Sequence, residues 1–139
     1  MRLGALALTL GLAAGPALAA RIVDPATARQ SIQSAAVASR AAQLAALAAD
    51  GRATELAAQL ESIARDATLT DVAQEYLLDR GLHDLARIPP TPDARASVAR
   101  LTVRAPTVLA RIDPDHGDRA TPLYDAGATA RFVLRTWDR

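Results

Sequence analysis

The sequence predicts an all-α fold, in which a signal peptide precedes a small helical bundle or a short α-solenoid of helix pairs. Apolar residues recur at intervals of three and four positions through most of the 139 residues, which is the spacing of one helix face. Asp, Thr and Pro stand where these stretches begin, and Gly or Pro stands where they end. No stretch alternates convincingly between apolar and polar residues, as a half-buried strand does. Residues 20–139 are therefore predicted to form a single helical domain.

The first 19 residues have the order of features found in a secretory signal peptide. Arg2 supplies a positive start, and residues 3–14 form an apolar run. The Gly-Pro pair at 15–16 breaks this run, and the small residues of 17–19 suit recognition by a signal peptidase. We therefore expect residues 1–19 to be removed, with cleavage after Ala19.

An uncleaved leader that tethers an envelope protein to the membrane is the alternative. Residues 3–20 are borderline in length for a span, which needs about 20 strongly apolar residues, and Pro16 interrupts them. Every basic residue is Arg, and the chain is rich in Ala, which indicates a GC-rich bacterial genome. The expected location is therefore the periplasm or the outside of the cell.

Composition excludes several classes of function. The chain has no cysteine, so disulfides, thiol nucleophiles and Cys-type zinc sites are excluded. Its 16 basic and 15 acidic residues leave no basic excess of the kind that nucleic-acid binding needs. We therefore expect no nucleic-acid partner.

Residues 24–50 are predicted to form one long Ala-rich helix. Asp24 suits the N-cap, Pro25 suits the first helical position, and Gly51 suits the end. Core packing and an oligomer seam are both open as roles for its Ala face. That face consists of Ala35, Ala38, Ala42, Ala45 and Ala49.

Residues 52–139 are predicted to be helical throughout. Thr68 and Asp71 are placed as a capping box, and Gly81 is placed at a helix end. Val98 and Val133 lie in the middle of apolar stripes that should face the core. The expected helical segments are 53–67, 68–82, 92–104, 106–112 and 122–139.

Short strings recur in the second half of the chain. The string LARIPP at 85–90 resembles LARIDP at 109–114, and DARASV at 93–98 resembles DAGATA at 125–130. Recurrence of this kind is typical of proteins built from stacked helical units.

Helix pairs joined by Pro-marked loops resemble the HEAT-like α-helical repeats over roughly residues 55–139. In such repeats the second helix often begins with Asp and carries Arg soon after, and Asp93 with Arg95 fits this pattern. Gly127 stands where the other copy would need Arg, so that copy departs from it. The resemblance implies a scaffold that presents surfaces to other proteins.

The segment Asp113–Asp118 is where polar side chains crowd together. Its acidic residues fail the EF-hand pattern, and the two histidines, His83 and His116, lack the spacing of a zinc site. A structural turn is the favoured interpretation, because Asp-Pro and Gly favour turns. A metal-binding or hydrolytic protein that uses this segment is the alternative.

Two other groups of side chains are candidates for a functional site. Glu61 and Glu75 are considered as a carboxylate pair, against the simpler reading of solvated helix surface. Tyr124, Phe132 and Trp137 are expected to pack in the core of the last helix pair, with a binding patch as the alternative. No catalytic, metal-binding or cofactor-binding residue is predicted.

The sequence therefore predicts an exported, non-catalytic helical module with a structural role or a role in protein interaction. Its expected partner is another protein, and the membrane is involved only if the leader stays attached. No cofactor is expected.

Cleavage of the leader is directly testable. N-terminal sequencing of the exported protein should begin at Ala20, or within a residue or two of it, because the peptidase site ends at Ala19. A full-length product that stays in the membrane would contradict this and would favour the tethered alternative.

Overall fold

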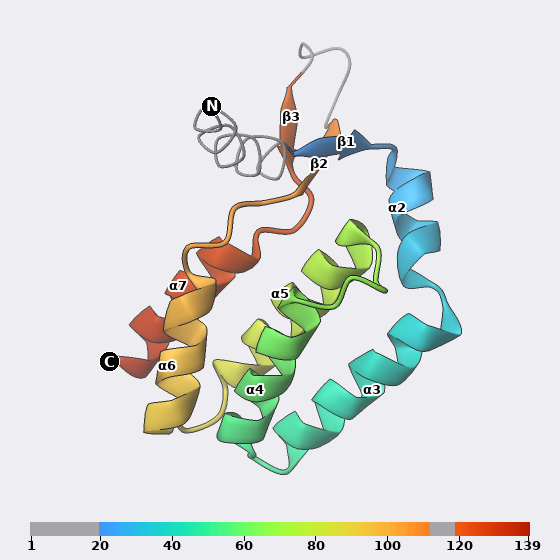
Figure 1. Cartoon of the computed structure of the whole chain (residues 1–139). Helices are drawn as coiled ribbons and strands as arrows, with labels where there is room; N and C mark the ends of the chain where they lie inside the picture. Colours follow the sequence, from blue (N-terminus) through green and yellow to red (C-terminus); the bar gives the residue numbers. More distant parts are fainter. Residues whose placement is uncertain (1–19, 112–118) are drawn as a thin grey trace, which may run out of the picture.

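A computed structural model describes residues 20–111 and 119–139. Within these ranges the chain is mostly helical, with a three-stranded sheet at one end of the helices (Figure 1). The helices are α2 (Pro25–Ile32), α3 (Ala35–Ala49), α4 (Ala53–Ala64), α5 (Asp71–Leu85), α6 (Pro92–Leu101) and α7 (Ala126–Trp137). The strands are β1 (Arg21–Val23), β2 (Val108–Arg111) and β3 (Ala120–Pro122).

Helices α4 and α5 form the centre of the molecule. They pack against each other, with α3 against both of them, while α6 contacts α4 and α7 contacts α5 (Figure 1). Helices α6 and α7 also contact each other. Each helix thus buries one apolar stripe against its neighbours, as the 3.6-residue period of the sequence predicts.

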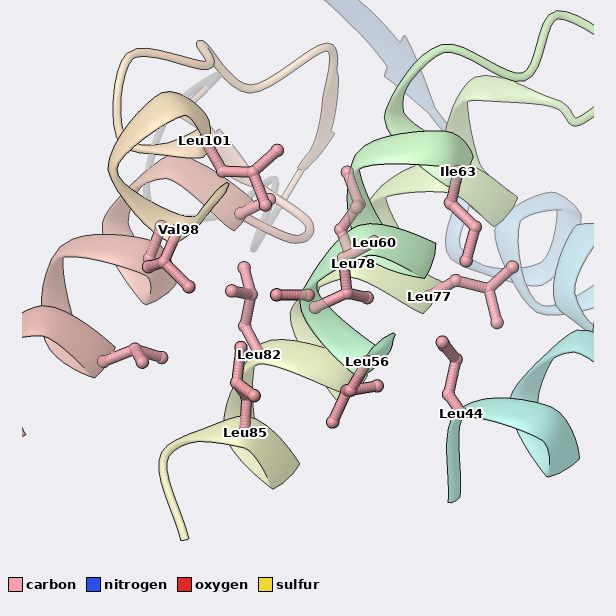
Figure 2. Packing of buried hydrophobic residues seen from close by; sticks show 14 of the residues in the cluster. Leu44, Leu56, Leu60, Ile63, Leu77, Leu78, Leu82, Leu85, Val98 and Leu101 are labelled. Atoms are coloured by element: carbon pink, nitrogen blue, oxygen red, sulfur yellow. The ribbon is translucent and has the colours of Figure 1, made fainter. Parts of the chain in front are cut away.

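The main hydrophobic core lies between these five helices. Figure 2 shows Leu60 of α4 among Leu77 and Leu82 of α5, and all three side chains are fully buried. Val98 and Val133 are also fully buried in this core, which confirms the stripes predicted for the last two helices.

Helix α5 is longer than the sequence analysis predicts. Gly81 was expected to end a helix, but α5 continues through it to Leu85. The reason is packing: a Cβ atom on Gly81 would overlap the side chain of Leu60 in α4. Gly81 therefore allows α4 and α5 to approach closely. The start of the helix is capped by Thr70, whose hydroxyl accepts a hydrogen bond from the N–H of Ala73 at 3.1 Å, and not by Thr68.

The sheet is the main departure from the all-α prediction. Strand β1 pairs with β2 in parallel, with Arg21 opposite Val108, and β2 pairs with β3 antiparallel. The helix expected at 106–112 is therefore wrong, because its described residues include β2. The last helix begins at Ala126 and not at 122, since Asp125 caps it through a 3.0 Å bond from Ala128 N–H.

A second, smaller hydrophobic cluster joins this sheet to the helices. Its buried members come from β1, α2, α5 and β2, and three partly buried residues pack against it. The buried members are Val23, Ala28, Val72 and Val108, and the packed residues are Ile32, Leu123 and Tyr124. The sheet is thus fixed to the first turn of α5.

The long helix expected at 24–50 is broken into α2 and α3. Gln33 and Ser34 lie between them, and the Ser34 hydroxyl accepts a hydrogen bond from the N–H of Val37 at 3.2 Å. The break lets α2 reach the sheet while α3 follows α4 and α5 (Figure 1). Tertiary packing therefore overrides the helix propensity of this stretch.

Candidate functional site

A charged groove lies where α4 and α6 end. It has a volume of about 370 Å³. We call it the α4–α6 groove. Its lining residues are Glu61, Ala64, Arg65, Arg100, Leu101, Val103 and Arg104.

Glu61 and Arg100 form one wall of this groove. The guanidinium of Arg100 donates two hydrogen bonds to the carboxylate, from Nε to Oε2 at 2.7 Å and from Nη2 to Oε1 at 2.8 Å. The hydrogen bonds from Arg100 lower the pKa of Glu61 to about 2. Glu61 is therefore a carboxylate at neutral pH and a weak base.

Glu75 and Arg104 form a second pair beneath the groove. The Nε of Arg104 donates to Oε2 of Glu75 at 2.6 Å, and the Glu75 side chain is fully buried. The Nη1 of Arg104 also donates to the backbone oxygen of Ala64 at 3.4 Å, at the end of α4. Arg104 therefore connects α4, α5 and the segment that follows α6.

Burial changes the electrostatics of Glu75. It raises the pKa of Glu75 above 4.5, against the opposing effect of Arg104 and of the Ala126 N–H in the first turn of α7. Oε1 has no hydrogen bond of normal geometry to any group in the described part of the chain. Arg104 is thus the main counter-ion of a buried carboxylate.

Val103 stands out on the rim of the groove. Its side chain is 86% exposed, although it is aliphatic and lies between two structured elements. The exposed Arg65 also lines the groove, and its charge acts to lower the pKa of Glu61. The rim therefore combines one exposed apolar side chain with guanidinium groups.

The carboxylate pair considered from the sequence does not form. Glu61 and Glu75 each bind an Arg of their own, and neither is a solvated surface residue. Arg100 and Arg104 were not predicted from the sequence as partners of these carboxylates. Arg100 and Arg104 are four positions apart, a spacing that places two side chains on the same face of a helix. This spacing was the indication in the sequence that both could reach the same pair of neighbouring helices.

The three aromatic residues near the C-terminus lie in three different places. Trp137 packs against the main core and donates from Nε1 to the backbone oxygen of Ile88 at 3.0 Å. Tyr124 packs against the second cluster, with its ring centroid 5.7 Å from that of Tyr76. Phe132 is 40% exposed beside His83. The prediction that they pack in the core of the last helix pair is therefore right for Trp137 and wrong for Tyr124 and Phe132.

The remaining candidates are only partly within the described residues. His83 is exposed, and its Nδ1 lies 3.6 Å from Oδ2 of Asp79. The segment Asp113–Asp118 lies outside the described residues. Among the residues that the structure describes, no group of three His, Asp or Glu side chains could hold a metal ion. Within the described ranges, no helix is long and apolar enough to cross a membrane.

Comparisons with known proteins assign no family. No family model, no curated protein and no solved structure matches the chain. The residues of the groove and of the leader therefore supply the evidence on function.

The ion pairs predict how stability depends on pH. The pKa values of Glu61 and Asp66 are about 2 in the folded chain, against ordinary values of 4.5 and 3.8. A lowered folded pKa stabilises the protein above the ordinary value, and this contribution is lost as the pH falls toward 2. Thermal melts should therefore show falling stability between about pH 4.5 and pH 2.

The variant Glu61→Gln isolates one of these groups. It should melt below the parent at neutral pH, and the difference should close as the pH approaches 2, where Glu61 becomes protonated. The same change at the half-buried Glu55, which lies on the same helix, is the matched control. A difference between Glu61→Gln and the parent that stays constant over this range would contradict the assignment.

Proposed function

We propose that the chain is an exported, non-catalytic helical module that binds another protein through the α4–α6 groove. The observation that carries the proposal is the exposed Val103 on a rim of Arg side chains. Arg is enriched at the energetic centres of protein interfaces, and an exposed aliphatic side chain gains free energy when a partner covers it.

The groove has unused hydrogen-bonding capacity. Each guanidinium carries five N–H donors, and Arg100 and Arg104 use only some of theirs on Glu61, Glu75, Ala64 and a neighbouring Ser. The ion pairs also hold the guanidiniums in place, which reduces the entropy lost on binding. We expect a partner surface that offers backbone or carboxylate oxygens around a small apolar hollow.

A binding role fits the chemistry of the groove better than catalysis does. A carboxyl group with a pKa of about 2, such as Glu61, is a poor general base or acid near neutral pH. The carboxylate of Glu75 is buried against Arg104 and does not line the groove. The role of these two carboxylates is therefore to hold the neighbouring Arg side chains in place.

Export is supported by the sequence of the leader and by the position of its cleavage site, which precedes the first described element in the chain. Cleavage after Ala19 would leave every described element intact, because β1 begins at Arg21. We therefore propose that the mature protein works in the periplasm or outside the cell.

The HEAT-like resemblance remains a prediction. The string at 85–90 runs from the last residue of α5 into the following loop, whereas residues 109–111 of its counterpart lie in β2. The strings at 93–98 and 125–130 both lie at the start of a helix, α6 and α7.

Capture from envelope extracts tests the proposal. The tagged protein and its double variant Arg65→Glu/Val103→Ser are compared, since both side chains are exposed and the changes should spare the fold. We expect the parent to capture a specific protein and the variant to lose it by about tenfold or more, because a central interface residue contributes upward of 1 kcal/mol.

The matched control is Phe132→Ser/Arg135→Glu, which makes the same two kinds of change on the exposed side of α7. It should capture the partner as the parent does. Equal capture by the groove variant would show that the groove is not the binding surface. Reciprocal capture with the tagged partner is needed to accept the interaction.

A further inference from the structure

We propose that two copies of this chain exchange their N-terminal arms, residues 20–33, to form a closed dimer. The arm holds β1 and α2, and the chain continues from it into the helical body through Gln33 and Ser34 (Figure 1). In the exchanged dimer, β1 and α2 of one copy dock on β2 and α5 of the other. The partner is therefore a second copy of this chain.

The first observation is a conflict between local preference and packing at the junction. Residues 24–50 favour one continuous helix, yet the structure interrupts it at Gln33 and Ser34. Gln33 has φ −90° and ψ 4°, which is close to helical, while Ser34 has φ −72° and ψ 154°. Rotation about ψ of Ser34 alone would thus nearly restore a helix from Pro25 to Ala49.

Such a continuous helix would have about 25 residues and a length of about 37 Å, at 1.5 Å per residue. It would carry β1 away from β2 of its own copy. Neither Gln33 nor Ser34 is a Gly or a Pro, so neither prevents the straight form. The junction is therefore a hinge with two available states.

The second observation is that the arm is held by contacts of its own. Val23 and Ala28 of the arm are buried in the second cluster and not in the main core. The guanidinium of Arg21 binds the carboxylate of Asp71 through Nη2 at 2.6 Å and Nε at 3.0 Å. Apart from the partly buried Ile32, which packs against both clusters, the arm can leave without opening the main core.

Departure of the arm exposes a surface that suits another arm of the same sequence. It leaves Val72 and Val108 uncovered, removes the partner of Asp71, and opens one edge of β2. An open strand edge recruits another strand. A second copy supplies β1 in the same register, Arg21 for Asp71 and Val23 for the cluster, so every lost contact is restored.

Because both forms contain the same contacts except at the hinge, concentration and hinge energy decide between them. An arm on a short tether docks on its own body with an effective concentration on the order of millimolar. Exchange is therefore favoured at high protein concentration or when the hinge prefers the straight form. The α4–α6 groove contains no residue of the arm, so this inference is independent of the proposed function.

Two single substitutions bias the hinge in opposite directions. Ser34→Ala removes the hydroxyl that caps α3 and adds a better helix former, so it should raise the dimer association constant about tenfold. Ala35→Pro suits the broken form, because Ser34 already has the extended backbone of a residue before proline and Pro favours the first helical position. It forbids the continuous helix, so it should abolish the dimer.

Sedimentation of the exported protein over a range extending to about millimolar measures these constants. We expect more dimer in Ser34→Ala than in the parent, and monomer alone in Ala35→Pro. A Ser34→Ala protein that stays monomeric throughout, or a dimer that persists in Ala35→Pro, would overturn the proposal.

A cysteine pair identifies which surfaces meet, since the chain has no cysteine of its own. Ile22 of β1 lies opposite Leu109 of β2, so Ile22→Cys and Leu109→Cys are introduced in separate Ser34→Ala proteins, which are unfolded and refolded together. Arm exchange predicts a mixed disulfide between positions 22 and 109, identified by mass, and its loss when Ala35→Pro is added. A dimer without this disulfide would show association through another surface and would also overturn the proposal.

Discussion

The buried ion pair between Glu75 and Arg104 is the interaction on which the arrangement of the last three elements depends. Arg104 lies in the connection between α6 and β2, while Glu75 lies inside α5, so their contact fixes that connection to the centre of the molecule. The same segment approaches α7 so closely that a Cβ on Gly127 would overlap the backbone oxygen of Arg104. A charge buried without its partner is strongly unfavourable, which makes the position of Arg104 obligatory.

This constraint also produces the surface that we assign to binding. With Arg104 directed inward to Glu75 and Ala64, its neighbour Val103 is left facing outward and almost fully exposed. One turn earlier, Arg100 is directed to Glu61 on the groove wall. A requirement of the core thus determines which side chains the groove presents to a partner, and it links the stability of the domain to its proposed function.

The sequence predicted what depends on local pattern and missed what depends on distant pairing. The apolar stripes through Val98 and Val133 were identified because a 3.6-residue period is visible within one segment. Strands of three or four residues are too short to show a period of two, and β1 pairs with β2, which lies far along the chain. The break at Ser34 was also missed, although Ser is a preferred N-cap residue and its hydroxyl accepts a hydrogen bond from the N–H of Val37. In the candidate site, Glu61 and Glu75 were identified as residues of interest, but their Arg partners come from another helix and its following segment.

A double-mutant cycle on Glu75 and Arg104 tests the central claim most directly. At neutral pH, Arg104→Met should reduce the free energy of unfolding by about 3–5 kcal/mol, because it leaves the buried carboxyl group of Glu75 without its partner, and Glu75→Leu/Arg104→Met should recover most of this loss. The cost of Arg104→Met should also shrink as the pH falls, because burial raises the pKa of Glu75 and protonation of its carboxyl group removes the unpaired charge. Losses that simply add in the double variant, with no dependence on pH, would contradict the claim that this pair holds the connection between α6 and β2 in place.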